Sequence, residues 1–171
     1  MQKIHTVHHR KNIRIKDYDY STENLYFVTI CTQNRKEILG KIVGDISYPK
    51  MQLTEFGKFV EITYHKTINN YKMKTHNYVI MPNHIHAIIE IRERAGTRPA
   101  PTICDVIRDI KSITTLEYIK AVKENRASAF NKRIWQRNYY EHIIRNEKEY
   151  LKTCEYIQNN ILNWKYDEYL T

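Results

Sequence analysis

The sequence predicts an α+β fold of the ferredoxin-like type, a βαββαβ antiparallel sheet with two helices on one face and a further C-terminal helix. Four short segments rich in β-branched and aromatic residues alternate with two longer segments whose apolar residues recur at helical spacing. Pro82-Asn83 separates the two middle β segments, which makes them antiparallel neighbours across a tight turn. A third helical pattern follows the fourth β segment. Because the two helices between the strands cover one face of the sheet, the other face is free for a functional site.

The first half of the fold is expected to hold a strand, a short hairpin and a helix. Residues 25–32 form a short apolar run typical of a buried strand, and a hairpin or short strand around 41–48 follows. Thr54 is a good N-cap residue, so we expect a helix from there to about residue 68. The apolar stripe of this helix consists of Phe56, Phe59, Val60, Thr63 and Tyr64.

The middle of the chain supplies two more strands and the second helix. Residues 75–81 and 84–91 are the second and third strands of the predicted sheet. Residues 92–101 contain a glycine and two prolines among charged residues, which predicts a loop. A helix over residues 103–122 comes next. Its apolar stripe consists of Ile103, Val106, Ile107, Ile110, Ile113, Leu116 and either Tyr118 or Ile119.

The end of the chain adds a fourth strand and the last helix. Residues 134–144 are predicted to form the strand. Asn146, with Glu149 three residues later, resembles a capping box that opens the last helix. Trp164 and Tyr166 are expected to close the C-terminus onto the body of the protein.

Composition narrows the class of protein. The 171 residues suggest one domain over residues 21–171, preceded by a basic N-terminal extension over residues 1–20 that is either a solvated tail or a DNA-contacting arm. No apolar stretch is long enough to span a membrane, and the N-terminus lacks the pattern of a signal peptide. Three scattered cysteines argue against a disulfide framework, so we expect a cytoplasmic protein. The net charge of +9 favours a polyanionic partner such as nucleic acid.

The third predicted strand carries a pair of histidines. Residues two apart in a strand share a face, so His84 and His86 point one way with Ile88 and Glu90, while the intervening apolar residues pack under the helices. Two neighbouring imidazoles can present two nitrogens to one divalent metal ion and leave positions open for a phosphate oxygen. A second interpretation stands beside this one: the pair consists of exposed or hydrogen-bonded histidines without a metal.

A tyrosine of the last helix is not explained by packing. At about 100° per residue, the apolar stripe of that helix consists of Tyr150, Leu151, Cys154, Ile157 and Ile161. Tyr156 falls on the opposite side, one turn before Asn160, so a phenol and an amide lie together. Tyr156 is either a nucleophile or a surface tyrosine. Tyr139, Tyr140 and Tyr150 are rival nucleophiles, of which Tyr150 is the weakest because it belongs to the packed stripe.

Four segments taken together carry a family resemblance. They are residues 18–21 leading into 26–35, residues 79–86, residues 134–146, and residues 156–160 followed by Trp164. On these segments the chain resembles the HUH single-tyrosine transposases, most closely the REP-associated tyrosine transposases. The resemblance implies an enzyme that cuts and rejoins single-stranded or hairpin DNA through a 5′-phosphotyrosine.

The resemblance also assigns roles to individual residues. It implies that His84, His86 and Asn160 bind a divalent metal ion, Mg or Mn, and that Tyr156 is the nucleophile. Ile161 stands where related chains often have proline, so the end of the last helix is left open. Relatives act as monomers or as homodimers, and the sequence does not decide between the two.

The mechanism implied by this resemblance needs phosphate contacts around the site. A tyrosine hydroxyl, with an ordinary pKa near 10, needs help to ionise at neutral pH. The candidates for DNA contacts are Lys111, Ser112, Arg35, Arg137, Arg145 and His142. Each of them has an equally simple interpretation as a solvated charge or a structural side chain.

Two other functions fit parts of the sequence. A replication initiator or relaxase-like nickase of the HUH class would share the metal and tyrosine chemistry but act at an origin. A non-catalytic module that binds single-stranded nucleic acid would share the fold, although such modules place aromatic residues on the central strands, where this chain has His84 and His86.

Overall fold

The computed structural model describes residues 24–45, 47–91 and 101–166 of the chain. Its helices and strands are, in chain order, β1 (Asn24–Cys31), η1 (Gln33–Arg35), β2 (Gly40–Val43), β3 (Lys50–Leu53), α1 (Glu55–Asn70), β4 (Lys74–Ile80), β5 (His84–Ile91), α2 (Ile103–Lys123), β6 (Tyr140–Ile144), α3 (Glu147–Asn159) and η2 (Trp164–Tyr166). The predicted N-terminal extension and almost all of the predicted loop over 92–101 lie outside the described residues. Within the described residues, no helix combines the length and the apolar character needed to cross a membrane.

The main sheet has four strands in the order β4-β5-β1-β6, and all neighbouring pairs are antiparallel. This order and the two intervening helices are those of a ferredoxin-like fold, so the predicted fold class is confirmed. Strands β2 and β3 form a separate hairpin between β1 and α1, slightly displaced from the predicted hairpin around 41–48.

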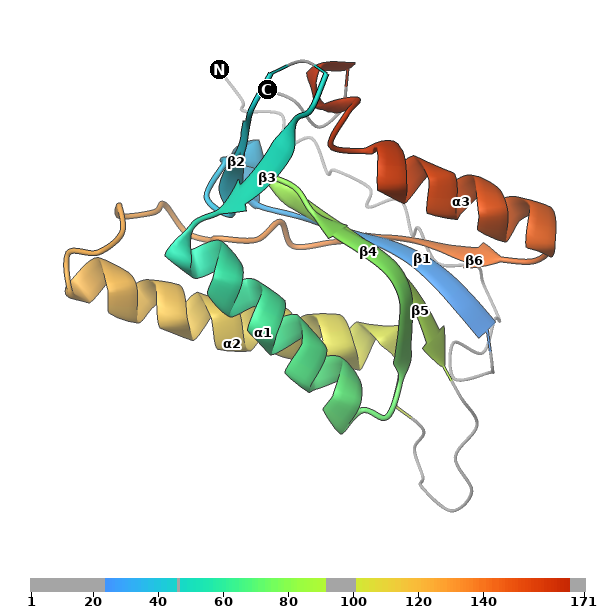
Figure 1. The fold of residues 1–171 in the computed structure, drawn as a ribbon. Helices are drawn as coiled ribbons and strands as arrows, with labels where there is room; N and C mark the ends of the chain where they lie inside the picture. Colours follow the sequence, from blue (N-terminus) through green and yellow to red (C-terminus); the bar gives the residue numbers. More distant parts are fainter. Residues whose placement is uncertain (1–23, 46, 92–100, 167–171) are drawn as a thin grey trace, which may run out of the picture.

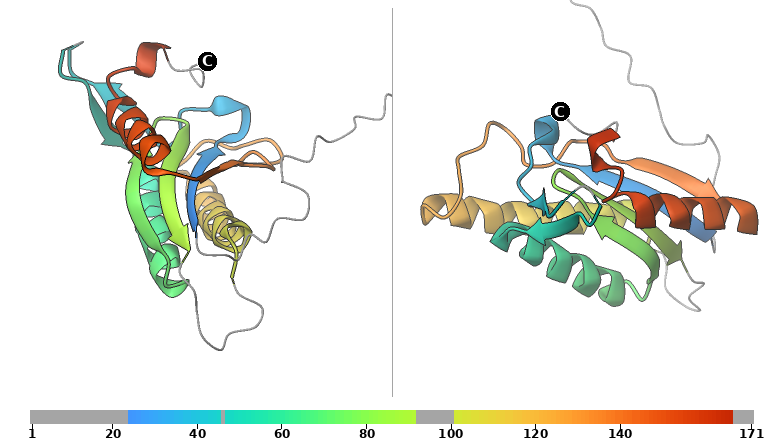
Figure 2. Two further views of the ribbon diagram at one scale, coloured as in Figure 1. Left: turned by 90° about the vertical axis from the view of Figure 1, so that its right-hand side faces the viewer. Right: turned by 45° about the horizontal axis from the view of Figure 1, so that its top comes forward.

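Helices lie on both faces of the sheet. Figures 1 and 2 show α1 and α2 side by side on one face and α3 on the other. The larger core lies between the sheet and α1 and α2, and it includes Val28 and Ile30 from β1 and Ile85, Ala87 and Ile89 from β5. A much smaller apolar cluster of Ile88, Ile144 and Ile157 lies under α3. The site described below is on this second face.

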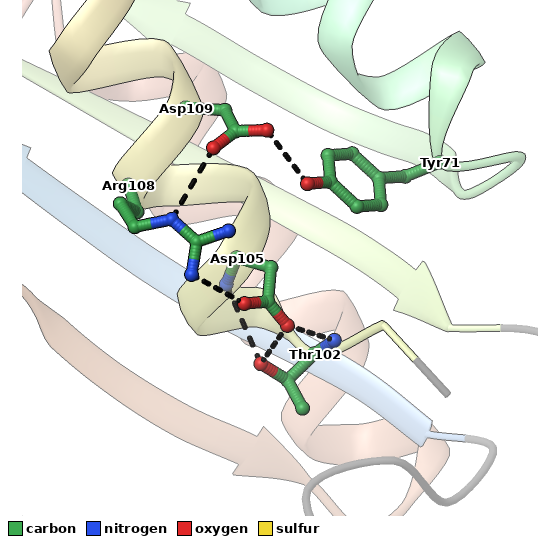
Figure 3. Close-up of polar contacts among 5 residues, drawn as sticks. All are labelled: Tyr71, Thr102, Asp105, Arg108 and Asp109. Atoms are coloured by element: carbon green, nitrogen blue, oxygen red, sulfur yellow. Dashed lines mark hydrogen bonds and ion pairs between the residues drawn. The ribbon is translucent and has the colours of Figure 1, made fainter. Parts of the chain in front are cut away.

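The two helices of the larger core begin at the predicted residues. The side chain of Thr54 accepts a hydrogen bond from the Gly57 N–H, which confirms it as the N-cap of α1. The Thr102 side chain caps α2 and forms a reciprocal capping box with Asp105 (Figure 3).

A hydrogen bond and two ion pairs fix the beginning of α2. The Tyr71 hydroxyl at the end of α1 donates to Asp109 Oδ2 over 2.6 Å, and Arg108 pairs with Asp105 and Asp109 (Figure 3). The Tyr71 hydrogen bond ties α2 to the end of α1, whereas both ion pairs lie within α2.

The buried face of α2 differs from the predicted stripe in its second half. Ile113 and Leu116 are 44% and 65% exposed, so their place in the stripe was wrong. The buried residues there are Thr114, Tyr118 and Ala121. Thr114 is buried because its hydroxyl donates to the Ile110 carbonyl and accepts from Trp135 Nε1, which satisfies its polar group.

The fourth strand is shorter than predicted. Residues 140–144 form β6, whereas residues 134–139 run beside η1 with a single bridge between Thr32 and Trp135. The backbone of Ile134 and Gln136 still bonds to Gln33 and Cys31, but the carbonyls of Gln136 and Asn138 accept hydrogen bonds from the Lys111 amine instead of from a strand. The predicted strand over 134–144 was therefore wrong in its first half.

Candidate active site

Strand β5 places the two histidines on the face of the sheet that α3 covers. Ile85, Ala87 and Ile89 belong to the core under α1 and α2, so the predicted alternation along this strand is confirmed. His84 and His86 are buried, and the centroids of their rings lie 4.4 Å apart. The turn before them is fixed, because the Met81 N–H donates to the His84 carbonyl over 2.8 Å.

A neighbouring polar group orients each imidazole. His84 Nδ1 lies 2.7 Å from Asn83 Oδ1, and the Asn83 amide is oriented by donating its Nδ2 hydrogen to the Arg35 carbonyl. His86 Nδ1 lies 2.8 Å from the hydroxyl of Thr29, its cross-strand partner on β1. With Nδ1 as the donor in both rings, each Nε2 carries a lone pair, which is the arrangement usual for metal-binding histidines.

Burial keeps both imidazoles neutral. It lowers the pKa of His84 to about 3, with a smaller contribution from the positive charge of Arg35, while the neighbouring Asn160 side chain acts in the opposite direction. Burial and the neighbouring His84 hold the pKa of His86 well below its ordinary value. A neutral imidazole is the form that binds a metal ion, so both rings are suitable ligands at physiological pH.

Helix α3 brings a phenol and an amide to the same place. The Tyr156 hydroxyl lies 3.2 Å from His86 Nε2 of the same chain, and the tyrosine side chain is 41% exposed. Asn160, the C-cap of α3, is 2% exposed, and its Oδ1 has no hydrogen-bond partner among the described residues. A buried amide oxygen without a partner costs free energy, so its presence beside His84 suggests a ligand that completes it.

The donor atoms fit a divalent metal ion. Imidazole nitrogens bind divalent transition metal ions, an amide oxygen binds harder ions as well, and the three atoms leave coordination positions for phosphate oxygens. Within the part of the chain that the structure describes, no three His, Cys, Asp or Glu side chains form a metal site. The amide oxygen of Asn160 is a further oxygen donor beside the two histidines.

The packed face of α3 is rotated relative to the predicted stripe. Leu151, assigned to that stripe, is 58% exposed, whereas Asn160 is buried and Thr153 is half-buried. The rotation turns the packed face toward Tyr156, so this tyrosine lies beside the packed face and contacts His86 instead of lying opposite. The helix ends at Asn159.

Histidines from both edge strands hold the first turns of α3. On one side, His76 of β4 bonds through Nε2 to Glu90 and through Nδ1 to the Tyr150 hydroxyl. On the other, His142 of β6 bonds through Nε2 to Glu149.

The N-terminus of α3 is capped in a way that differs from the predicted capping box. The Asn146 side chain accepts from the Glu149 N–H, as predicted, but the Glu149 carboxylate accepts from the Arg145 N–H instead of that of Asn146. This bond and then His142 lower the pKa of Glu149.

The predicted DNA contacts fall into separate groups. The positive charge of Arg35 helps to lower the pKa of His84, so its role as a DNA contact beside the paired histidines stays a prediction. His142 and Arg145 both act on Glu149 in the first turn of α3. The remaining three, Lys111, Ser112 and Arg137, line a pocket of about 350 Å³ beside α2 that contains neither of the paired histidines.

Lys111 has a structural function in this fold. Its amine donates to the carbonyls of Gln136 and Asn138 over 2.9 and 3.0 Å, and burial lowers its pKa to about 8. The structure therefore does not favour Lys111 as a solvated side chain that contacts a DNA phosphate.

The buried amine of Lys111 predicts a pH-dependent stability. Between pH 7 and pH 9.5 the folded protein loses the Lys111 proton, while the unfolded chain, with a lysine pKa near 10.4, largely retains it. The unfolded state then binds more protons, so the free energy of unfolding should rise with pH, by about 2 kcal/mol relative to Lys111→Met. Urea unfolding of both proteins at the two pH values measures the difference, and a difference that does not change with pH would mean that the amine is solvated.

The rival tyrosines occupy different positions. The Tyr139 hydroxyl donates to Glu141, and the Tyr150 hydroxyl bonds to His76. Tyr140 lines the same pocket as Tyr156 and His86, so it is the one rival that is close to the site.

Several residues of the site were not identified from the sequence. Thr29 orients His86, Asn83 orients His84, and the Phe27 ring stacks on His86 at 5.3 Å between centroids. Trp164, which packs as predicted, lies 6.0 Å from the His84 ring. Asn83 had a signal, since a turn asparagine next to a histidine is within reach of its Nδ1. The pairing of β1 with β5, which brings Thr29 and Phe27 to the site, has no signal in one sequence. The side chain of Tyr166 lies outside the described part of the structure.

The chain is similar to known proteins along most of its length. The sequence model of the family described as "Transposase IS200 like" matches residues 21–160. A Haemophilus influenzae protein of unassigned function is 37% identical over 95% of this chain and 93% of its own length. A second protein of that organism, 27% identical over 88% of this chain and 77% of its own length, is named as a REP-associated tyrosine transposase.

Solved structures share the fold. A REP-associated tyrosine transposase bound to a REP hairpin superposes with a TM-score of 0.57 at 19% identity, over 92% of this chain and 76% of that one. A Deinococcus radiodurans protein described as a transposase gives a TM-score of 0.50 at 14% identity, over 85% of this chain and 95% of that one.

Proposed function

Because the chain belongs to the IS200-like transposase family and is of the REP-associated tyrosine transposase type, we propose that it cuts and rejoins hairpin-containing single-stranded DNA with Tyr156 as the nucleophile. His84, His86 and Asn160 would hold a divalent metal ion, Mg or Mn. The resemblance identified from the sequence is confirmed by the family match.

One observation carries the proposal. The Tyr156 hydroxyl lies 3.2 Å from His86 Nε2, next to a second oriented imidazole and a buried amide oxygen without a hydrogen-bond partner among the described residues. The phenol and the three candidate ligands come from two elements far apart in sequence, β5 and α3. If Tyr156 were only a surface tyrosine and the histidines only structural, the phenol, the two imidazoles and the amide would have no reason to lie together.

The chemistry follows from these positions. A bound metal ion would withdraw charge from the scissile phosphate. His86 Nε2 has a single lone pair, which accepts the phenol O–H here and would bind the metal ion when one is present. The Tyr156 hydroxyl is then free to turn toward the phosphate. The side chain of Arg35, which acts on His84, adds positive charge next to the same group.

The proposed cut conserves the energy of the phosphodiester. The Tyr156 oxygen forms a bond to phosphorus, the bond from phosphorus to the 3′-oxygen breaks, and that oxygen takes up a proton as the phenol gives one up. The product is a 5′-phosphotyrosine with a free 3′-hydroxyl. A second 3′-hydroxyl can reverse the step, so rejoining needs no ATP.

Hairpin DNA is the proposed substrate for two reasons. The structural neighbour with the same fold was solved with a REP hairpin bound to it. The chain also has a net charge of +9, which favours a polyanion through counterion release.

A covalent adduct tests the proposal. The full chain is incubated with end-labelled DNA hairpins that carry single-stranded flanks, in the presence of Mn, and then denatured on a gel. We expect an adduct that EDTA prevents, and peptide mapping by mass spectrometry should place the nucleotide on Tyr156. The absence of any adduct over a broad set of hairpins, or an adduct mapped to Tyr140, would contradict the proposal.

A further inference from the structure

A pocket of about 520 Å³ opens beside the proposed nucleophile, on the side away from His84 and Asn160. Tyr156 and His86 form one wall, and Phe27 and Tyr140 contribute rings from β1 and β6. Its size falls within the range of about 300–1,000 Å³ that is typical of small-molecule sites. The proposed cleavage chemistry uses only the wall formed by Tyr156 and His86, which leaves the rest of the pocket without a function.

The lining of the pocket is dominated by ring surface. Phe27 is stacked on His86, and the ring of Tyr140 lies 6.2 Å away and that of Tyr156 6.0 Å away, both edge to face. Tyr140 is 46% exposed, so much of its ring is available to a ligand. Two charged residues, Glu149 and Lys152, lie at the α3 side of the same pocket.

This combination suits one ligand in particular. An aromatic group with an attached phosphate would pack on the rings and find a cation in Lys152. A nucleobase of single-stranded DNA has this chemistry, and its faces are uncovered, unlike those of a base in a duplex. Tyr156 lines the pocket, so a strand with a phosphate at the Tyr156 hydroxyl has its neighbouring base within reach of the pocket.

We propose that this pocket binds one unpaired base next to the scissile phosphate, by stacking on Tyr140 and Phe27. The inference rests on the proposed function in taking single-stranded DNA as the ligand. Tyr140, considered above as a rival nucleophile, becomes a binding residue that positions the phosphate. Its ring, and not its hydroxyl, is the part that binding requires.

Fluorescence tests this without requiring cleavage. In single-stranded hairpin-flank oligonucleotides, each position in turn carries 2-aminopurine, whose emission falls when the base stacks on an aromatic ring. The full chain with Tyr156→Phe, which keeps the ring but has no nucleophile, is added at saturation. We expect strong quenching at one position, or at two adjacent ones. A second substitution in the same chain, Tyr140→Ala, should remove most of that quenching. The alternative second substitution, Tyr140→Phe, should retain it.

The matched control is Tyr48→Ala, which removes an exposed tyrosine ring from the turn between β2 and β3. A cleavage assay uses chains that keep Tyr156. An abasic site at the quenched position of the substrate should slow cutting about tenfold in the wild-type chain and much less in Tyr140→Ala, as expected for the loss of one stacked base. Equal quenching in Tyr140→Ala and Tyr48→Ala, or quenching at no position, would contradict the proposal that this pocket binds a base.

The two proposals fail in different ways. Position-specific quenching without any covalent adduct would refute the proposed cleavage and retain the base pocket. Adducts on Tyr156 together with quenching that ignores Tyr140 would refute the pocket and retain the cleavage.

Discussion

Replacement of Tyr156 by phenylalanine will abolish the covalent protein–DNA adduct and lower the rate of strand cleavage by roughly three orders of magnitude or more. The substitution removes one oxygen atom, which is the atom that attacks phosphorus in the proposed mechanism. The ring stays in place, because its contacts with Phe27 and His86 are edge-to-face packing contacts. The side chain is 41% exposed, so we expect little change in the free energy of unfolding.

Tyr140→Phe is the matched control for this experiment. It removes the same atom from a tyrosine of the same pocket with similar exposure. Gel assays of cleavage and of adduct formation should show a nearly unchanged rate for this variant. An adduct that survives in Tyr156→Phe and disappears in Tyr140→Phe would move the nucleophile to β6 and refute the assignment.

Replacement of Asn160 by leucine is expected to have opposite effects on stability and activity. Asn160 Oδ1 is buried without a hydrogen-bond partner among the described residues, and a leucine of similar shape removes that cost. The metal-free protein should therefore be as stable as the wild type or more stable. If Asn160 is the third metal ligand, cleavage should fall by about 10²-fold or more, because two imidazoles alone hold a divalent ion weakly.

Melting temperatures with and without Mn measure the ligand role directly. At about 100 times the dissociation constant, a bound ion stabilises the folded state by about 2.7 kcal/mol, which raises the melting temperature of a chain of this size by roughly 5–10 °C. We expect this rise in the wild type and in the control Asn163→Leu, which changes an exposed asparagine just after α3. A full rise in Asn160→Leu would exclude the amide from the metal site.

Local sequence patterns predicted most of the fold because the elements concerned bury one face against a core. The alternation over residues 84–91 gave the bounds and both faces of β5, since every second side chain there packs under α1 and α2. Thr54 marked the start of α1 through the hydrogen bond that its hydroxyl accepts. These signals are contained in a few neighbouring residues.

Predictions that depended on partners distant in sequence were less accurate. Leu116 and Leu151 were assigned to packed stripes because they are apolar at helical spacing, but both are exposed. Thr114 is buried in α2 because Trp135, 21 residues later, donates a hydrogen bond to it. This contact is not visible in the local pattern of residues 103–122.

The site shows the same division. The histidine pair, Tyr156 and Asn160 could be proposed from spacing and family resemblance, and the structure places them together. The residues that orient or flank them, Thr29 and Phe27, lie on β1 and reach the site through cross-strand pairing with β5. Register between distant strands follows from the whole sheet, so a single sequence does not reveal it.

Helix α3 is attached so weakly that the proposed site can be lost without unfolding of the rest of the protein. Of the residues within this helix, only Ile157 is buried, and the apolar cluster beneath it is far smaller than the core under α1 and α2. An element with so little buried surface can leave the sheet at a small fraction of the cost of global unfolding. Warming would therefore separate Tyr156 from the paired histidines before the chain melts, so the proposed cleavage would stop while the rest of the chain remains folded.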